Sequence, residues 1–205
     1  MRNPIDSFGL VVRLLPVMLL AGLVACSTSL EKRLDLTGYE PVVQGAKGSG
    51  EIYLARPVLA EKPPVLPGGR IVLGYVQGTG EQLVTRDDLS EWVADALAKE
   101  LQSSGYEVKR SPDLPPQASR GIVVRIVQLS AGQTDGLLPI TSTSVHLAAD
   151  IWENGRLVKT MTAGAESKDE GIDRSGEFVA ASLRKQLQTV MQELVPDIVK
   201  ALSSP

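Results

Sequence analysis

The chain has 205 residues and a net charge of −3, because 24 acidic residues outnumber 21 basic ones, and it contains a single cysteine. This balance argues against nucleic-acid binding, which usually leaves a basic footprint on the protein. One cysteine excludes an intramolecular disulfide, so the domain must be stable through packing alone. The roughly 150 residues in the second part of the chain are enough for one ordinary hydrophobic core.

The first 25 residues have the features of a secretory leader. Arg2 and Arg13 give a basic start, an apolar stretch follows, and the small residue Ala25 stands just before Cys26. The apolar stretch is too short to span a bilayer as a stable helix. We therefore expect residues 1–25 to be a cleaved signal peptide.

Cys26 ends the sequence Leu23-Val24-Ala25-Cys26, which resembles the lipobox of bacterial lipoproteins. The resemblance implies that the thiol is acylated, that it becomes the mature N-terminus, and that three lipid chains anchor the protein. One chain alone holds a protein only reversibly, since each buried methylene contributes about 0.8 kcal/mol. Ser27, in place of Asp, resembles the pattern of enterobacterial lipoproteins sent to the outer membrane. The alternative is an unmodified thiol in an apolar leader.

Residues 26–50 are predicted to be the lipidated N-terminus and a flexible tether. The stretch is polar, has no sustained apolar period, and is interrupted by Gly38, Pro41, Gly45, Gly48 and Gly50. A flexible chain of this length has a root-mean-square reach of roughly 27 Å. Such a reach suits contact with the peptidoglycan layer or a partner, or simple spacing from the membrane.

A single folded domain is predicted over residues 51–205. Strands are expected near residues 51–56 and 70–76, and the prolines and glycines between them argue against a regular element there. A helix is expected over residues 86–104, because the carboxylates of Asp87 and Asp88 are stabilising near the positive, N-terminal end of a helix dipole. Gly105 ends this helix, and its apolar residues recur at helical spacing: Leu89, Trp92, Val93, Ala96, Leu97 and Leu101.

Four strands and a long helix complete the predicted domain. The strands are expected near residues 106–109, 121–130, 142–152 and 155–163, and the second of them is continuously apolar, which suits a central position. The helix begins near residue 173 or 175 and carries an apolar stripe. Pro196 falls on the solvent side of that stripe, so we expect the helix to continue past it.

Asn154-Gly155 is the strongest hairpin signal in the chain, because a type I′ turn needs positive φ at both central residues. A two-residue turn places Ile151 opposite Val158, and Asp150 opposite Lys159. In that register the core face carries Val145, Leu147, Ala149, Ile151 and Val158.

The other face of the hairpin is more apolar than a solvated surface should be. The same register gathers Trp152, Leu157 and Met161 there, and exposed apolar patches often mark partner contacts. These three residues are therefore a candidate partner surface. The alternative is that the C-terminal helix or a loop covers this face and makes Trp152 a core residue.

The sequence offers little for catalysis. His146 is the one histidine, and no acidic or cysteine residues surround it at metal-ligand spacing. Asp150 lies roughly 13 Å along the same strand face, too far for a Ser-His-Asp triad. No phosphate-binding loop or dinucleotide fingerprint occurs. We therefore expect no enzymatic activity, no metal site, and no cofactor beyond the covalent lipid on Cys26.

The order of elements resembles the YajG family of uncharacterised bacterial lipoproteins. The resemblance rests on Leu97 through Val108, on Val124 to Leu129, and on Asn154-Gly155 with its flanks, and it is weaker over residues 51–69. That family has no established catalytic residues, so the resemblance assigns no functional role to any residue of this chain. The pattern of elements itself predicts an α+β domain, in which an antiparallel or mixed β-sheet is packed by two amphipathic helices.

Two functional hypotheses follow from this sequence. The leading one is an outer-membrane-anchored lipoprotein that faces the periplasm and acts as a non-enzymatic binding or assembly module with an envelope protein as its partner. The alternative is an accessory lipoprotein of an envelope export or lipid-transport complex. A hydrolase is the least favoured reading.

Overall fold

A computed structural model describes residues 30–203, and residues 31–203 belong to one compact unit. The predicted signal peptide and the predicted lipidation site at Cys26 lie outside the described residues. No helix within the described residues is both long and apolar enough to cross a membrane.

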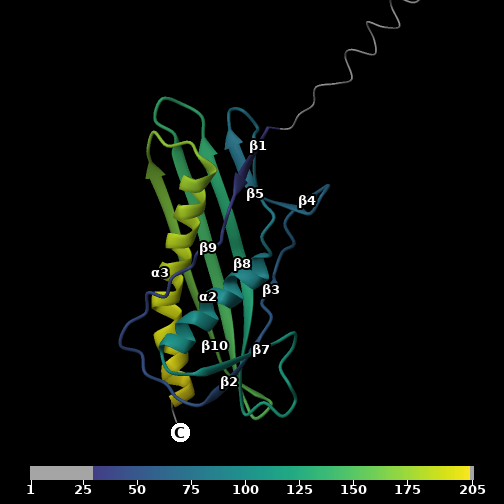
Figure 1. Cartoon of the computed structure of the whole chain (residues 1–205), viewed down its shortest axis with the longest axis vertical. Helices are drawn as coiled ribbons and strands as arrows, with labels where there is room; N and C mark the ends of the chain where they lie inside the picture. The colour runs from purple at the N-terminus through teal and green to yellow at the C-terminus, as the bar shows by residue number, and fades with distance from the viewer. Residues whose placement is uncertain (1–29, 204–205) are drawn as a thin grey trace, which may run out of the picture. The chain divides into compact units, whose positions relative to one another are not determined.

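The described chain combines strands with two helices, as the sequence pattern predicts for an α+β fold (Figure 1). The elements follow in the order β1 (Glu31–Leu34), β2 (Glu51–Ala55), β3 (Val58–Leu59), β4 (Val65–Leu66), β5 (Arg70–Gln77), β6 (Gln82–Thr85), α2 (Leu89–Ser103), β7 (Glu107–Ser111), β8 (Arg120–Thr134), β9 (Ile140–Glu153), β10 (Arg156–Glu170) and α3 (Gly176–Ser203).

Within residues 30–203, ten strands form one mixed sheet around the long strands β8, β9 and β10. β9 lies between β8 and β10 and pairs with both in the antiparallel sense. The other side of β8 pairs in parallel with β2, then β3, then β5 along its length. β7 extends the sheet beside β2, whereas β6 and β1 extend it beside β5. β10 is therefore an edge strand.

Both helices cover the core face of this sheet. α3 lies along β9 and β10, and α2 packs against β7 and α3 (Figure 1). Apolar residues from both helices and from the inward positions of the strands form one core. The sheet contributes Ile122, Val124, Ile126, Val145, Leu147, Ala149 and Ile151, all of them buried.

The helix boundaries follow from their caps. Asp88 caps α2, because its carboxylate accepts hydrogen bonds from the backbone N–H groups of Ser90 and Glu91. The helix thus begins at Leu89 and not at residue 86. α3 continues through Pro196, whose side chain is exposed, as the sequence predicts.

The hairpin between β9 and β10 has the predicted turn. Asn154 has φ of 47° and Gly155 has φ of 75°, the two positive values that a type I′ turn requires. The two-residue strands β3 and β4, and the short strand β6, are absent from the sequence-based prediction. β3 and β4 each form only two bridges to a neighbouring strand. Strands of two residues are too short to show hydrophobic periodicity in the sequence.

The prediction of a flexible tether up to residue 50 is wrong for residues 31–50. β1 lies in this segment and pairs in parallel with β6. Leu34, Leu36 and Tyr39 are buried in the core. The segment is therefore part of the folded domain, although its composition is that of a linker.

Glu100, fully buried on α2, fixes this segment in place. Its Oε1 accepts hydrogen bonds from the Tyr39 hydroxyl at 2.5 Å and from the backbone N–H of Val42 at 2.8 Å. Its Oε2 accepts the backbone N–H of Val43 at 3.1 Å. Burial, together with the hydrogen bond to Glu100, raises the pKa of Tyr39. A single carboxylate, more than 50 residues away in the sequence, thus holds this glycine-rich segment in place.

Candidate functional site

The predicted partner surface of Trp152, Leu157 and Met161 does not form. The pairing of β10 with β9 shifts by one residue at Val158, which forms a bulge. Leu157 lies opposite Trp152, as predicted, but Met161 lies opposite Ala149 on the core face and is only 7% exposed. Val158, expected in the core, is 54% exposed. One extra residue moves each later side chain of the strand to the other face.

The same bulge changes the partners of Asp150. The predicted pair of Asp150 with Lys159 is wrong, because Thr160 takes the opposite position on β10. The Thr160 hydroxyl donates a hydrogen bond of 2.6 Å to Asp150, and the Arg125 guanidinium lies 3.5 Å from the same carboxylate. These contacts make the surroundings of Asp150 polar, whereas Leu157 and Val158, nearer the turn, stay exposed.

The sheet face opposite the helices instead carries a polar hollow of about 500 Å³ over β8, β9 and β10. Alternation along the strands places polar side chains there, because the intervening residues face the core. We call this surface the outer hollow, and the polar side chains that line it are Gln128, Ser130, Ser142, Ser144, Glu166 and Lys168. Donors and acceptors of this kind suit contact with a polar surface.

His146 stands next to the outer hollow and is partly exposed. Its Nε2 lies 3.2 Å from Oε1 of Glu166, and the Ser144 hydroxyl lies 3.4 Å from that same oxygen. Gly164 leaves room for the imidazole, because a Cβ at this position would lie 2.9 Å from the ring. The sequence does not reveal Glu166 as a partner, since the contact is diagonal and depends on the register that the bulge sets.

The geometry of Ser144, His146 and Glu166 differs from that of a hydrolytic triad. In a triad the hydroxyl contacts the imidazole, and the carboxylate orients the opposite ring nitrogen. Here the Glu166 carboxylate contacts both groups through one oxygen and separates the hydroxyl from the ring. Among residues 30–203, no three His, Cys, Asp or Glu side chains converge so as to hold a metal ion. The three side chains form one cluster that is joined through Glu166.

The free edge of β10 borders the outer hollow. Within the part of the chain that the structure describes, the 15 residues of β10 pair with β9 alone, whereas the edge strands β1 and β7 have four and five residues. Natural edges are usually short or protected by charges and prolines. Residues 160–165, Thr-Met-Thr-Ala-Gly-Ala, contain neither a charge nor a proline. Long strand edges of this kind present unpaired backbone groups to another chain.

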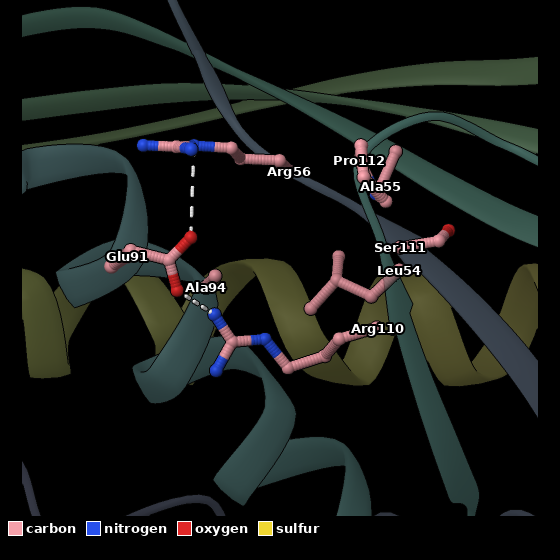
Figure 2. Close-up of a pocket in the computed structure, with 8 residues that line it drawn as sticks. All are labelled: Leu54, Ala55, Arg56, Glu91, Ala94, Arg110, Ser111 and Pro112. Carbon is pink, nitrogen blue, oxygen red and sulfur yellow. Dashed lines mark hydrogen bonds and ion pairs between the residues drawn. The ribbon is translucent and has the colours of Figure 1, made fainter.

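A smaller pocket of about 320 Å³ lies where β2 and β7 meet α2. Figure 2 shows the Glu91 carboxylate between the guanidinium groups of Arg56 and Arg110, with Nε of Arg56 at 3.6 Å. Asp88 also pairs with Arg56, and Asp95 with Arg110. Three carboxylates thus neutralise two guanidinium groups. The cluster ties α2 to the sheet and does not present an open site for an anion.

A third polar cluster lies under α3. The Ser182 hydroxyl lies 2.9 Å from the Thr143 hydroxyl and donates a hydrogen bond of 3.0 Å to Asp169. Ser167 lies 3.0 Å from Thr143 and donates to the same carboxylate at 2.9 Å. The four side chains satisfy one another and join α3 to β9 and β10, which is a structural role.

No protein-family model matches the chain, and no curated protein matches it, so the resemblance to the YajG family stays a prediction. Among solved structures the chain is similar to protein XCC0632 from Xanthomonas campestris, of family DUF330, with 16% identity over 83% of this chain and 95% of that chain and a TM-score of 0.57. Protein CT253 from Chlamydia trachomatis matches with 13% identity over 78% of this chain and 100% of that chain, and a TM-score of 0.46. Lipoprotein GNA1162 from Neisseria meningitidis matches with 11% identity over 74% of this chain and 99% of that chain, and a TM-score of 0.40. The first similarity shows that this chain and XCC0632 share a fold.

Proposed function

We propose that the protein is a lipid-anchored envelope lipoprotein that binds a protein partner through the free edge of β10 and catalyses no reaction. The leader and the lipobox-like sequence that ends at Cys26 support the anchor. Ser27 supports placement at the outer membrane, with the domain in the periplasm. The partner is an extended segment of another envelope protein.

One observation carries the binding role, namely the uncharged, unpaired edge at residues 160–165 of β10. Strand addition to such an edge gives affinity through main-chain hydrogen bonds, and side-chain pockets next to the edge give specificity. The outer hollow supplies that second element, because Glu166 and Lys168 line it from β10 itself. An added strand would lie beside these side chains.

The arrangement around His146 supports a role without catalysis. Glu166 stands between the Ser144 hydroxyl and the imidazole, so the hydroxyl lacks the histidine base of a hydrolytic triad. The same three groups offer a hydroxyl, a carboxylate and an imidazole ring to a bound surface. Binding to a partner can use such groups without the precise relative geometry that a catalytic triad requires.

Photo-crosslinking in cells tests the proposal. A photoreactive side chain at Thr162, which is exposed on β10, is expected to give discrete adducts with a partner, while the same group at Gln102, exposed on α2, is not. Thr162→Lys is expected to weaken recovery of that partner without a change in melting temperature, because lysine on an edge strand opposes strand addition. Gln102→Lys is the matched control.

The identity of the adduct assigns the role more closely. A transporter subunit would make the protein an accessory lipoprotein of an export or lipid-transport complex, and a second copy of the chain would make β10 an assembly edge. Equal adducts from Thr162 and Gln102, or recovery that is unaffected by Thr162→Lys, would contradict the proposed edge.

A further inference from the structure

Two loops at one end of the domain expose large apolar side chains. Leu137 and Leu138 lie in the loop between β8 and β9 and are 95% and 66% exposed, and Ile172, between β10 and α3, is 83% exposed. We call these three residues the apolar tip. Nothing in the described residues covers them, and clustered apolar side chains at a surface mark contact sites.

The two loops are held together as one structure. The backbone N–H of Gly171 donates a hydrogen bond of 3.1 Å to the carbonyl of Pro139. Arg174, from the second loop, pairs with Asp135 of the first at 2.9 Å and also donates to the carbonyl of Gly136. The apolar tip is therefore a built surface rather than two independent loops.

The folded domain begins at this same end. β1 runs parallel to β6 from Glu31, and β6 follows the turn after Gln77, whose carbonyl accepts the backbone N–H of Asp135. Lys32 donates a hydrogen bond of 2.6 Å to Gln133, two residues before the first loop. Figure 1 shows the start of β1 at the end of the domain where the β8–β9 and β10–α3 loops lie.

The distance along the chain from the predicted anchor is short. Four residues separate Cys26 from Glu31, so their Cα atoms are at most roughly 18 Å apart. The two headgroup regions of a bilayer together add about 10–15 Å to the thickness of its core. The maximum distance from Cys26 to Glu31 is therefore comparable to the thickness of a few headgroup layers. With residues 31–50 folded, no long tether lifts the domain away from the lipid.

We infer that the apolar tip inserts into the lipid surface that holds the acyl chains of Cys26. This inference rests on the proposed lipid anchor. The anchor keeps the tip at high local concentration near the membrane, so three side chains suffice to orient a domain that they could not recruit alone. The long strands then stand upright, and the Asn154-Gly155 hairpin lies roughly 45 Å from the lipid, at about 3.3 Å per strand residue.

The charges near the tip indicate which lipids take part. Arg174 is already paired with Asp135, and the Asp173 carboxylate accepts the backbone N–H of Ser175 at 2.7 Å. These loops therefore offer no cluster of unpaired cations for anionic headgroups. Insertion is driven by apolar contact, so it should occur in vesicles of zwitterionic phosphatidylethanolamine and phosphatidylcholine.

The test uses the mature protein, acylated at Cys26, in such vesicles. Acylation of Cys26 occupies the only native thiol, so Leu138→Cys can carry a single environment-sensitive fluorophore. Val158→Cys is the control, since Val158 is similarly exposed but lies at the hairpin end of β10. Brominated lipids are expected to quench most of the emission from position 138 and to leave position 158 unchanged. Ile172→Cys is expected to behave like Leu138→Cys.

The mass of the intact protein separates the two possible failures. Retained acyl chains without quenching at positions 138 and 172, or with equal quenching at position 158, would overturn the inference about the apolar tip alone. A mature mass without acyl chains would overturn the lipid anchor and the inference with it.

Discussion

The carboxylate of Glu100 is expected to decide whether residues 39–43 stay folded. In Glu100→Ala the Tyr39 hydroxyl and the backbone N–H groups of Val42 and Val43 lose their acceptor. A buried donor without a partner costs about 1–3 kcal/mol. Because the two backbone groups are only partly buried and water can reach them, we expect a total loss of about 3–5 kcal/mol in the free energy of unfolding.

Milder variants separate the individual contacts. Tyr39→Phe removes one hydrogen bond and keeps the ring, so it should cost about 1 kcal/mol. Glu100→Gln keeps one acceptor oxygen but turns an amide NH₂ toward one of the three donors, and it should cost about 1–3 kcal/mol. Glu193→Gln makes the same change of charge on an exposed part of α3 and should stay within about 0.5 kcal/mol of wild type.

Urea unfolding gives these free energies, and chymotrypsin reports on the segment directly. Cleavage after Tyr39 should be slow in the native protein, because this residue is 5% exposed, and fast in Glu100→Ala under conditions where the core remains folded. Rapid cleavage at Tyr39 in the unmodified protein would refute the reasoning. It would mean that this segment is a flexible tether, as its composition predicts. Unfolding of Glu100→Ala at the same urea concentration as wild type would refute it as well.

Three further predictions test other parts of the structure. Met161→Ala should lower the free energy of unfolding by about 2–5 kcal/mol, while Leu157→Ala should change it by less than about 0.5 kcal/mol, and equal losses in urea would show that the bulge is misplaced. Hydrogen bonds from Ser175 lower the pKa of Asp173, so its stabilising effect on the start of α3 should be complete above the ordinary value of 3.8 and be lost as pH falls through the lower folded-state value; a carboxyl chemical shift that titrates above 3.8 would contradict this. Cys26→Ser should abolish labelling by a palmitate analogue and release the protein from the membrane fraction or leave its leader attached, and label that survives the substitution would remove the basis for the anchor.

The elements that the sequence predicts well are those whose signal is local. The helix near residues 89–103 has an N-cap, an apolar stripe and a terminal glycine within one stretch of chain. The apolar strand at residues 120–134 and the Asn154-Gly155 turn also carry their own signals. The type of each element follows from such patterns because periodicity and turn chemistry act over a few residues.

The features that the sequence does not predict depend on distant partners. β1 has only four residues, and its pairing with β6 joins positions 31 and 82. The segment that follows looks like a linker because it is rich in glycine, and its order comes from Glu100 on a helix. No local pattern distinguishes such a segment from a tether, since the contacts that fold it are tertiary.

The predicted partner surface of Trp152, Leu157 and Met161 is wrong because of a single residue. The prediction places Trp152 beside Leu157 correctly, but the bulge at Val158 reverses the facing of the strand beyond it. Met161 thus enters the core, and Glu166 reaches His146. A bulge adds one residue without a distinct composition, so register beyond it cannot be read from alternation alone.

Amide hydrogen exchange along β10 tests the proposed binding edge most directly. In an edge strand, alternate backbone N–H groups pair with the neighbouring strand and the others face solvent. In the isolated full-length protein, amides in residues 160–165 should therefore alternate between slow and fast exchange. Once the partner captured at Thr162 is bound, the fast amides should become slow. Uniformly slow exchange in the isolated protein, or fast amides that the partner leaves unprotected, would contradict the account.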